Sequence, residues 1–198
     1  VISTGSLCPV HLMHLEVLEC AIDHLEKTGK YNVLAGYLSP SHDIYVSGKL
    51  GNNAISSSHR VKMVEILCQN SEKISVSSWE ANEMYFVDYP QVVHFHKEYF
   101  NRILPKTIPE LLDFLPIRVI YVCGSDHAIR CSLLSLKQEG VVVVSRPGIR
   151  ERDREKLKQH YELTEKELLD ISSTKIRASI KRKQPLEELC GPNVSEYL

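Results

Sequence analysis

The 198-residue sequence has almost no net charge, with 24 Lys and Arg against 25 Asp and Glu. Without an excess of either sign, no strong electrostatic field draws the whole chain to nucleic acid or to an anionic membrane. We therefore expect neither a nucleic-acid partner nor a membrane partner. Any anion that the chain binds must be held by a local arrangement of donors and cations.

The sequence also lacks long apolar segments and paired cysteines. No apolar run approaches the roughly 20 residues that a membrane-spanning helix needs, and no signal-type segment opens the chain. The six cysteines are scattered without a CxxC pair, unlike the dense disulfide frameworks of small secreted domains. We expect reduced thiols and an intracellular protein, in the cytoplasm or the nucleus.

Apolar periodicity predicts strands that alternate with helices. The predicted strands cover residues 1–4, 32–38, 74–77, 118–123 and 141–145. The predicted helices cover residues 12–25, 58–67, 85–104, 128–136 and 175–180, the third with an interruption at Pro90. This order predicts an α/β fold with a mostly parallel sheet and helices on both faces, in a single domain over residues 1–198.

Turns that carry polar or reactive side chains follow the predicted strands. They lie at Gly5, Ser39, Trp79, Gly124 and Arg146. Ligands of parallel sheets bind beyond the carboxyl ends of the strands. We therefore expect these turns to converge on one active site.

Two histidines follow the first of these turns, in the segment Gly5-Ser6-Leu7-Cys8-Pro9-Val10-His11-Leu12-Met13-His14. Their three-residue spacing should place both imidazoles on one face of the first helical turn. With the backbone N–H groups of that turn, they could bind phosphate oxygens and stabilise charge on a leaving pyrophosphate. The alternative is a pair of ordinary surface histidines. A metal site is the weaker interpretation, because the sequence suggests no third ligand.

A second helix start suited to phosphate lies near the end of the sequence. Ser172, Ser173 and Thr174 precede a helical segment, and Ser and Thr are preferred N-caps. Their hydroxyls and amides could bind ATP phosphates, while Arg177 presents a planar guanidinium one turn later. Taken alone, this segment also fits a common helix cap.

Together these motifs resemble a known superfamily. GSxxPxHxxH near the start and ISSTKIR near the end are similar to the paired signatures of the HxxH nucleotidyltransferases. Between them, residues 36–45 with Lys49, residues 58–61, Trp79-Glu80 and residues 123–126 resemble the eukaryotic-type nicotinamide/nicotinate mononucleotide adenylyltransferases. The resemblance covers nearly the whole chain.

That family implies a Rossmann-like, doubly wound parallel sheet. The implied reaction is in-line attack of the phosphate of nicotinamide or nicotinate mononucleotide on the α-phosphorus of ATP, giving NAD or deamido-NAD and pyrophosphate. No covalent enzyme intermediate is implied. We expect Mg²⁺ to arrive with ATP, not in a dedicated carboxylate cage.

The resemblance also implies roles for individual residues. The implied catalytic residues are His14, His11, Arg177 and Lys49. The implied ATP-binding residues are Gly5, Ser6, His14, Gly124, Asp126, Ser172, Ser173, Thr174 and Arg177. The implied mononucleotide-binding residues are Ser6, Leu7, Lys49, Trp79 and Glu80.

For several of these residues a purely structural role remains as the alternative. Lys49 is expected in a mobile loop over residues 47–53, where it could gate the triphosphate or simply be solvated. Trp79 could stack on the pyridine ring or belong to the core. Asp126 could serve only as an N-cap. His59 and Arg60 could likewise serve only in helix capping and surface packing.

The sequence departs from its relatives near the acceptor. Leu7 and Cys8 stand where the relatives usually have Phe and Asn, and no aromatic residue lies between His127 and His160, where a second Trp normally follows. Two alternatives therefore stay open: transfer to another phosphomonoester, such as phosphopantetheine or a polyol phosphate, and a non-catalytic nucleotide-binding module. Assembly into a homo-oligomer also stays open.

Overall fold

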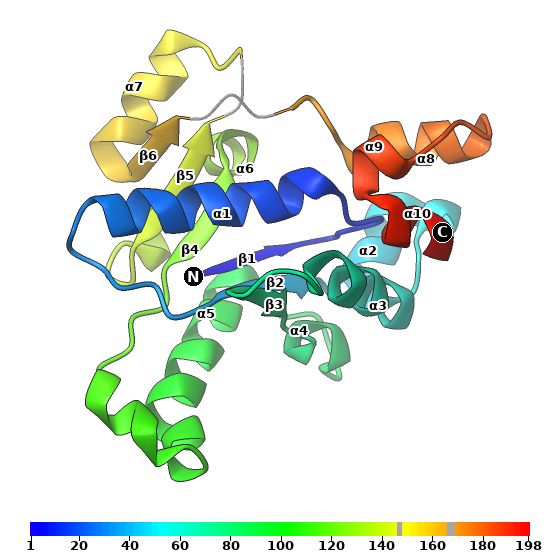
Figure 1. Cartoon of the computed structure of the whole chain (residues 1–198). Helices are drawn as coiled ribbons and strands as arrows, with labels where there is room; N and C mark the ends of the chain where they lie inside the picture. Colours follow the sequence, from blue (N-terminus) through cyan, green and yellow to red (C-terminus); the bar gives the residue numbers. More distant parts are fainter. Residues whose placement is uncertain (146–147, 166–168) are drawn as a thin grey trace.

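The structure is a computed structural model that describes residues 1–145, 148–165 and 169–198. These residues form a six-stranded sheet in the order β3-β2-β1-β4-β5-β6, and each pair of neighbouring strands is parallel. Helices lie on both faces of the sheet (Figure 1). The predicted α/β fold is confirmed.

The elements alternate along the chain. The strands are β1 (Ile2–Gly5), β2 (Gly36–Pro40), β3 (Ile74–Val76), β4 (Tyr121–Gly124), β5 (Val141–Ser145) and β6 (Glu162–Glu165). The α-helices are α1 (Leu12–Lys27), α2 (Asp43–Leu50), α3 (Ser57–Cys68), α4 (Trp79–Asn82), α5 (Tyr89–Glu98), α6 (Ser125–Arg130), α7 (Glu151–His160), α8 (Ser173–Lys181), α9 (Glu187–Cys190) and α10 (Pro192–Tyr197). Short 3-10 or π turns are η1 (Gly51–Asn53), η2 (Tyr99–Ile103), η3 (Leu104–Lys106), η4 (Pro109–Phe114) and η5 (Leu134–Leu136).

The central strands are apolar on both faces, and this divides the core in two. In β5, Val142 and Val144 join the cluster that contains α1, whereas Val141 and Val143 join the cluster that contains α5. Successive side chains of a strand point to opposite faces, so a run of valines feeds both layers. The continuous valine run is therefore what allows helices to cover both faces.

The strand order places β1 beside β4 at the centre of the sheet. The chain builds β1, β2 and β3 in one direction, then returns through α4, α5 and η2–η4 to start β4. Such a reversal is a topological switch point, and ligands bind at the carboxyl ends of the strands there. The ends of β1 and β4 are Gly5 and Gly124.

The strands predicted over residues 32–38 and 118–123 begin later, at Gly36 and Tyr121, and three other predicted segments differ in kind. The helix expected over residues 85–104 begins at Tyr89, and Pro90 lies in its first turn instead of interrupting it, where a missing N–H costs nothing. The helix expected over 128–136 is α6 followed by a separate turn, η5. The loop expected over residues 47–53 is the end of α2 followed by η1.

Candidate active site

The loop after β1 leads directly into α1 and carries both predicted histidines. His11 is the N-cap of α1, and its backbone N–H donates to Nδ1 of His14 at 3.1 Å. The two rings stack with centroids 3.7 Å apart. His11 is only 2% exposed, so it backs the more accessible His14. Because Nδ1 of His14 accepts a hydrogen bond, the neutral ring carries its proton on Nε2.

The second predicted phosphate motif packs against this loop. The Ser173 hydroxyl donates to the carbonyl of Pro9 at 2.9 Å, and Arg177 Nη1 donates to the carbonyl of Cys8 at 2.6 Å. Nη2 of Arg177 also donates to Thr174 Oγ1 at 3.1 Å. The structure thus joins the N-terminus of α8 to the loop that precedes α1. Two helix N-termini, each with backbone N–H groups to offer an anion, lie at one place.

Lys49 reaches the same loop from the end of α2. Its Nζ donates to Ser6 Oγ at 3.2 Å. Partial burial and the nearby charges of Arg130 and Arg177 lower the pKa of Lys49 below its usual value. Arg130 and Arg177 therefore both lie close enough to Lys49 to repel its positive charge, and a bound anion would offset this repulsion. Sequence reasoning missed Arg130, which ends α6 and lies in no motif.

Arg60 holds this loop against β2 and is completely buried. Its guanidinium donates to the carbonyls of Ser6 at 3.0 Å, Ser41 at 2.6 Å and Ile55 at 2.9 Å. It also pairs with Asp43 Oδ1 at 2.8 Å. The alternative that placed Arg60 in surface packing is therefore wrong. An arginine is rarely buried, and here its planar set of donors matches acceptors from three separate loops.

Glu80 of α4 is a buried carboxyl beside the end of β2. It is 2% exposed and accepts a hydrogen bond from the Ser39 hydroxyl at 2.7 Å. Burial raises the pKa of Glu80 to about 7, although the hydrogen bonds from Ser39 and Ser41 act against this. In this position Glu80 fixes Ser39. A direct contact with the mononucleotide stays a prediction.

Trp79 packs among helices instead of standing in open space. It lies flat on Phe95 of α5, with ring centroids 3.8 Å apart and 3° between the planes. It meets His96 edge-on. One face of the indole is therefore already covered, which favours the core alternative for Trp79, and stacking on a pyridine ring stays the untested alternative.

A different aromatic pair lies beside Lys49, and sequence reasoning missed it. Tyr45 of α2 stacks on Phe86 with centroids 5.2 Å apart, and Nζ of Lys49 lies 5.6 Å from the Tyr45 ring centroid. Tyr45 and Phe86 are 41% and 39% exposed. The signal available in the sequence was the run Met84-Tyr85-Phe86, which a helical interpretation of this segment obscured.

Gly124 and Asp126 lie where β4 passes into α6. Parallel pairing of Ile2 with Tyr121 brings the end of β4 beside the end of β1. Gly124 is the N-cap of α6, and Asp126 is an exposed residue in its first turn. Arg146, the last of the expected turns, lies outside the described residues.

Within the part of the chain that the structure describes, no group of three or more His, Cys, Asp or Glu side chains could hold a metal ion. Likewise, no helix of the described residues has the length and apolar character required to cross a membrane. The candidate site therefore consists of cations, hydroxyls and helix N-termini at the centre of the carboxyl edge.

Comparison with known proteins places this arrangement in a family. The cytidylyltransferase-like family matches residues 2–179, and the chain belongs to it. Three curated relatives match over 100% of the chain. The nicotinamide/nicotinic acid mononucleotide adenylyltransferases of Oryza sativa subsp. japonica and Arabidopsis thaliana are 28% and 27% identical, with 82% and 86% of their lengths covered. Nicotinamide/nicotinic acid mononucleotide adenylyltransferase 1 of Bos taurus is 27% identical, with 85% covered. These relatives confirm the resemblance drawn from the motifs.

Proposed function

We propose that this chain transfers the adenylyl group of ATP to nicotinamide or nicotinate mononucleotide, releasing pyrophosphate and giving NAD or deamido-NAD. The observation that carries the proposal is the junction of the two helix N-termini through Ser173–Pro9 and Arg177–Cys8. A triphosphate needs several donors and cations that converge on it. The relatives named above, which match the whole chain, support the same reaction.

In this proposal the chain aligns and neutralises charge, and needs no covalent intermediate. His14 donates from Nε2 to a phosphate oxygen, with His11 holding its ring. Arg177 and Lys49 offset the negative charge that spreads over the α-phosphate and the leaving pyrophosphate. Ser172, the N-cap of α8, belongs to the cradle for the phosphates. Mg²⁺ would enter with the substrate ATP and would offset part of the phosphate charge, alongside Arg177 and Lys49.

The acceptor is proposed to lie between Lys49 and the pair Tyr45–Phe86. An exposed aromatic pair offers a flat apolar face to a pyridine ring, and Lys49 beside it could meet the acceptor phosphate. Gly5, Ser6 and Leu7 would border the acceptor phosphate. On the other side of the switch point, Gly124 and Asp126 are proposed to contact the nucleoside part of ATP.

The experiment incubates purified protein with MgATP and either mononucleotide, and measures dinucleotide and pyrophosphate together. A His14→Ala variant is compared with His94→Ala, which removes an exposed histidine of α5. We expect equal amounts of both products, lost in His14→Ala and retained in His94→Ala. Absence of dinucleotide from the unsubstituted protein with both acceptors would contradict the proposal.

A second acceptor class is favoured by one observation. Leu7 and Cys8 are 4% and 0% exposed, so the two positions that differ from the usual Phe-Asn of the relatives offer no exposed polar side chain to the mononucleotide. Transfer to another phosphomonoester, such as phosphopantetheine or a polyol phosphate, would show in an acceptor screen as pyrophosphate release without NAD. If the protein binds ATP but releases no pyrophosphate with any of these acceptors, it would be a non-catalytic nucleotide-binding module.

We also propose that residues 1–198 work as one domain inside the cell, in the cytoplasm or the nucleus. One sheet extends from Ile2 to Glu165, and α8 returns to the loop after its first strand, so the site draws on both ends of the chain. ATP and pyridine mononucleotides are intracellular metabolites, which supports the location.

A further inference from the structure

A cavity lies at the opposite edge of the sheet from the candidate active site. It has a volume of about 600 Å³, which falls in the range of about 300–1,000 Å³ typical of small-molecule sites. Its walls include Ile2 at the start of β1, Ala35 before β2 and Val119 before β4. These residues lie at the amino ends of strands whose carboxyl ends form the candidate active site. A ligand here would not overlap with the nucleotides.

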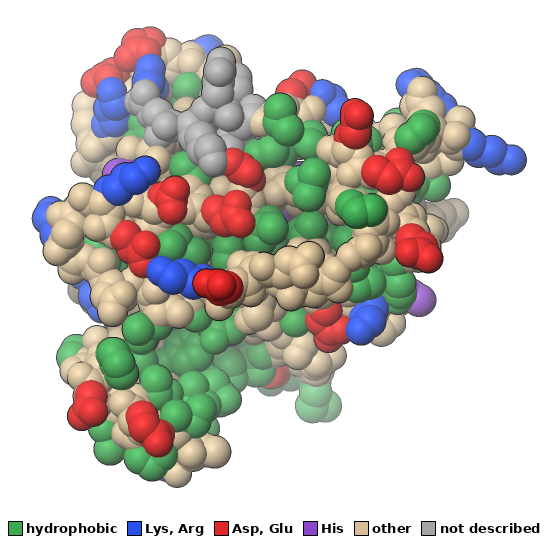
Figure 2. Space-filling model, viewed as in Figure 1, with side chains coloured by type: hydrophobic (Ala, Val, Ile, Leu, Met, Phe, Trp, Pro, Cys, Tyr) green, Lys and Arg blue, Asp and Glu red, His purple; other side chains and the backbone are tan. Residues whose placement is uncertain are grey.

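One wall of this amino-edge cavity is apolar and comes from the segment between α5 and β4. Phe100, Leu104, Leu111 and Phe114 line it, and Tyr37 stacks on Phe100 with centroids 5.5 Å apart. Figure 2 shows hydrophobic side chains gathered in the hollow between this segment and the rest of the molecule. Contact between such a surface and water is unfavourable, so the surface favours an apolar occupant.

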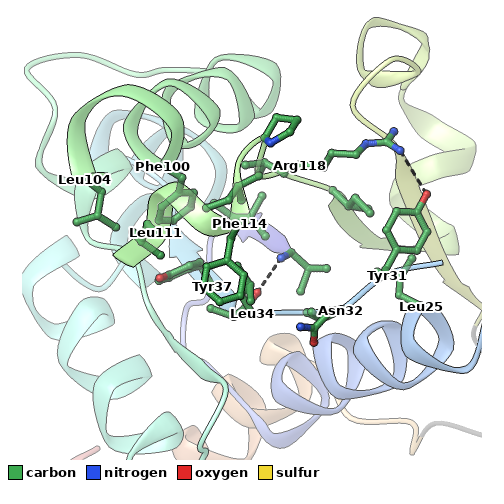
Figure 3. Close-up of a pocket in the computed structure, with 18 of the residues that line it drawn as sticks. Leu25, Tyr31, Asn32, Leu34, Tyr37, Phe100, Leu104, Leu111, Phe114 and Arg118 are labelled. Carbon is green, nitrogen blue, oxygen red and sulfur yellow. Dashed lines mark hydrogen bonds between the residues drawn. The ribbon is translucent and has the colours of Figure 1, made fainter. Parts of the chain in front are cut away.

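The other wall carries positive charge. Among the described residues that line the cavity, Lys30 and Arg118 are cationic and none is acidic. In Figure 3, Arg118 and Tyr31 lie across the cavity from Leu104 and Leu111. The Arg118 guanidinium donates to Tyr31 Oη at 3.4 Å and to the carbonyls of Gln138 and Glu139 at 3.3 Å each.

These partners of Arg118 are neutral oxygens, and their hydrogen bonds are long. Within the described part of the chain, Arg118 forms no ion pair. The charge of its guanidinium is thus not compensated by a carboxylate, in contrast to Arg60, which pairs with Asp43. An arginine in this state is suited to accept a carboxylate, sulfonate or phosphate group.

We propose that this amino-edge cavity binds a small amphipathic anion. Its apolar body lies against Phe100, Leu111 and Phe114, and its anionic head meets Arg118 and Lys30. Charge complementarity selects this occupant over a neutral apolar molecule, and the apolar wall selects it over a free inorganic anion. The proposal does not depend on adenylyl transfer.

The test uses two probes with the purified chain. Anilinonaphthalene sulfonate, an aromatic anion that becomes fluorescent in apolar sites, reports occupancy, and decanoate is titrated to displace it. Decanol serves as the neutral counterpart of decanoate. We expect displacement by decanoate at concentrations at least tenfold lower than by decanol, and displacement by neither ATP nor nicotinamide mononucleotide.

Variants then separate the two walls. Arg118→Gln should weaken decanoate about tenfold, the loss of one charge-assisted contact, while leaving decanol unchanged. Arg182→Gln, which removes the exposed arginine after α8, is the matched control and should change nothing. Phe114→Asp, at a side chain 52% exposed, should weaken decanoate and the dye at least tenfold.

Lys30→Gln, at an exposed lysine, provides a second charge variant should Phe114→Asp or Arg118→Gln fail to fold, and it should weaken decanoate without affecting decanol. The proposal is overturned if decanoate and decanol bind equally. It is also overturned if ATP displaces the dye, or if the charge variants behave as Arg182→Gln does.

Discussion

Replacing Arg60 with methionine tests how the loop after β1 is held in place. Methionine keeps the apolar stem and fills most of the buried space but provides no donors. The three carbonyls of Ser6, Ser41 and Ile55, which Arg60 reaches at 2.6–3.0 Å, lose their partner. The free energy of unfolding should therefore fall, and the fall can be divided among the contacts.

Each neutral carbonyl that loses its hydrogen bond costs about 1 kcal/mol. The ion pair with Asp43 adds little, because that carboxylate is 42% exposed and solvent screens it to about 0.5 kcal/mol or less. We expect Arg60→Met to lower the free energy of unfolding by about 3–4 kcal/mol, which corresponds to a Tm lower by roughly 6–16 °C. The rate of transfer should fall up to about 100-fold at temperatures where the variant is folded, since the position of Ser6 is no longer fixed.

Urea denaturation and thermal melting of three variants provide the assay. Asp43→Asn should cost less than about 1 kcal/mol, and Arg182→Met, at an exposed site, should lie within about 0.5 kcal/mol of the unsubstituted protein. The reasoning is refuted if Asp43→Asn destabilises the chain as much as Arg60→Met. In that case the ion pair, and not the backbone carbonyls, would carry the contribution of Arg60.

Three further predictions concern the candidate site. Lys49→Gln should lower kcat/KM for transfer by about 10–100-fold with an unchanged Tm. The control Lys62→Gln, at an exposed lysine of α3, should change neither quantity, and equal kinetics of the two variants would contradict a role for Lys49. Burial raises the pKa of Glu80 from 4.5 to about 7, so its protonated form is favoured by folding: this contribution is complete below pH 4.5 and is lost as pH rises to about 7. Glu80→Gln should therefore flatten the dependence of unfolding free energy on pH in this window, and an unchanged slope would show that Glu80 does not titrate there. Phe86→Leu should raise the KM for mononucleotide about tenfold without lowering the Tm. The mononucleotide should leave the fluorescence of Trp79 nearly unchanged, and strong quenching would show that the pyridine ring stacks on Trp79 instead.

Local patterns predicted the parts of the fold that follow from short-range physics. The helix expected over residues 12–25 is Leu12–Lys27, because its apolar spacing and Gly29 fix both ends. The valine run over residues 141–145 is β5 at both boundaries. In contrast, the second half of α2 was expected to belong to a loop over residues 47–53, since Gly48 and its polar neighbours are weak helix formers. Its N-cap, His42, accepts a hydrogen bond from Ile44 N, and Arg60 fixes its first residue, Asp43, a contact that no local pattern reveals.

The residues of the candidate site also divide into those that local sequence patterns could predict and those that they could not. The two motifs that begin helices, with His14 and Arg177, could be found because helix starts have residue preferences and phosphate sites use them. Arg130 and the pair Tyr45–Phe86 could not, because these residues are far apart in the sequence and only the folded chain brings them near Lys49. The buried state of Arg60 was also beyond reach, since arginine side chains are mostly exposed.

The bond from Ser173 to Pro9 joins residues 164 positions apart, and this separation sets an order of events during synthesis. A nascent chain can form α1 early, since the hydrogen bonds within a helix are local, but closing so long a loop waits for the last part of the sequence. Until α8 has left the ribosome, the first helix N-terminus lacks Ser173 and Arg177. A partly synthesised chain would therefore hold triphosphate poorly, and affinity for nucleotide would report the moment at which the chain is complete through α8.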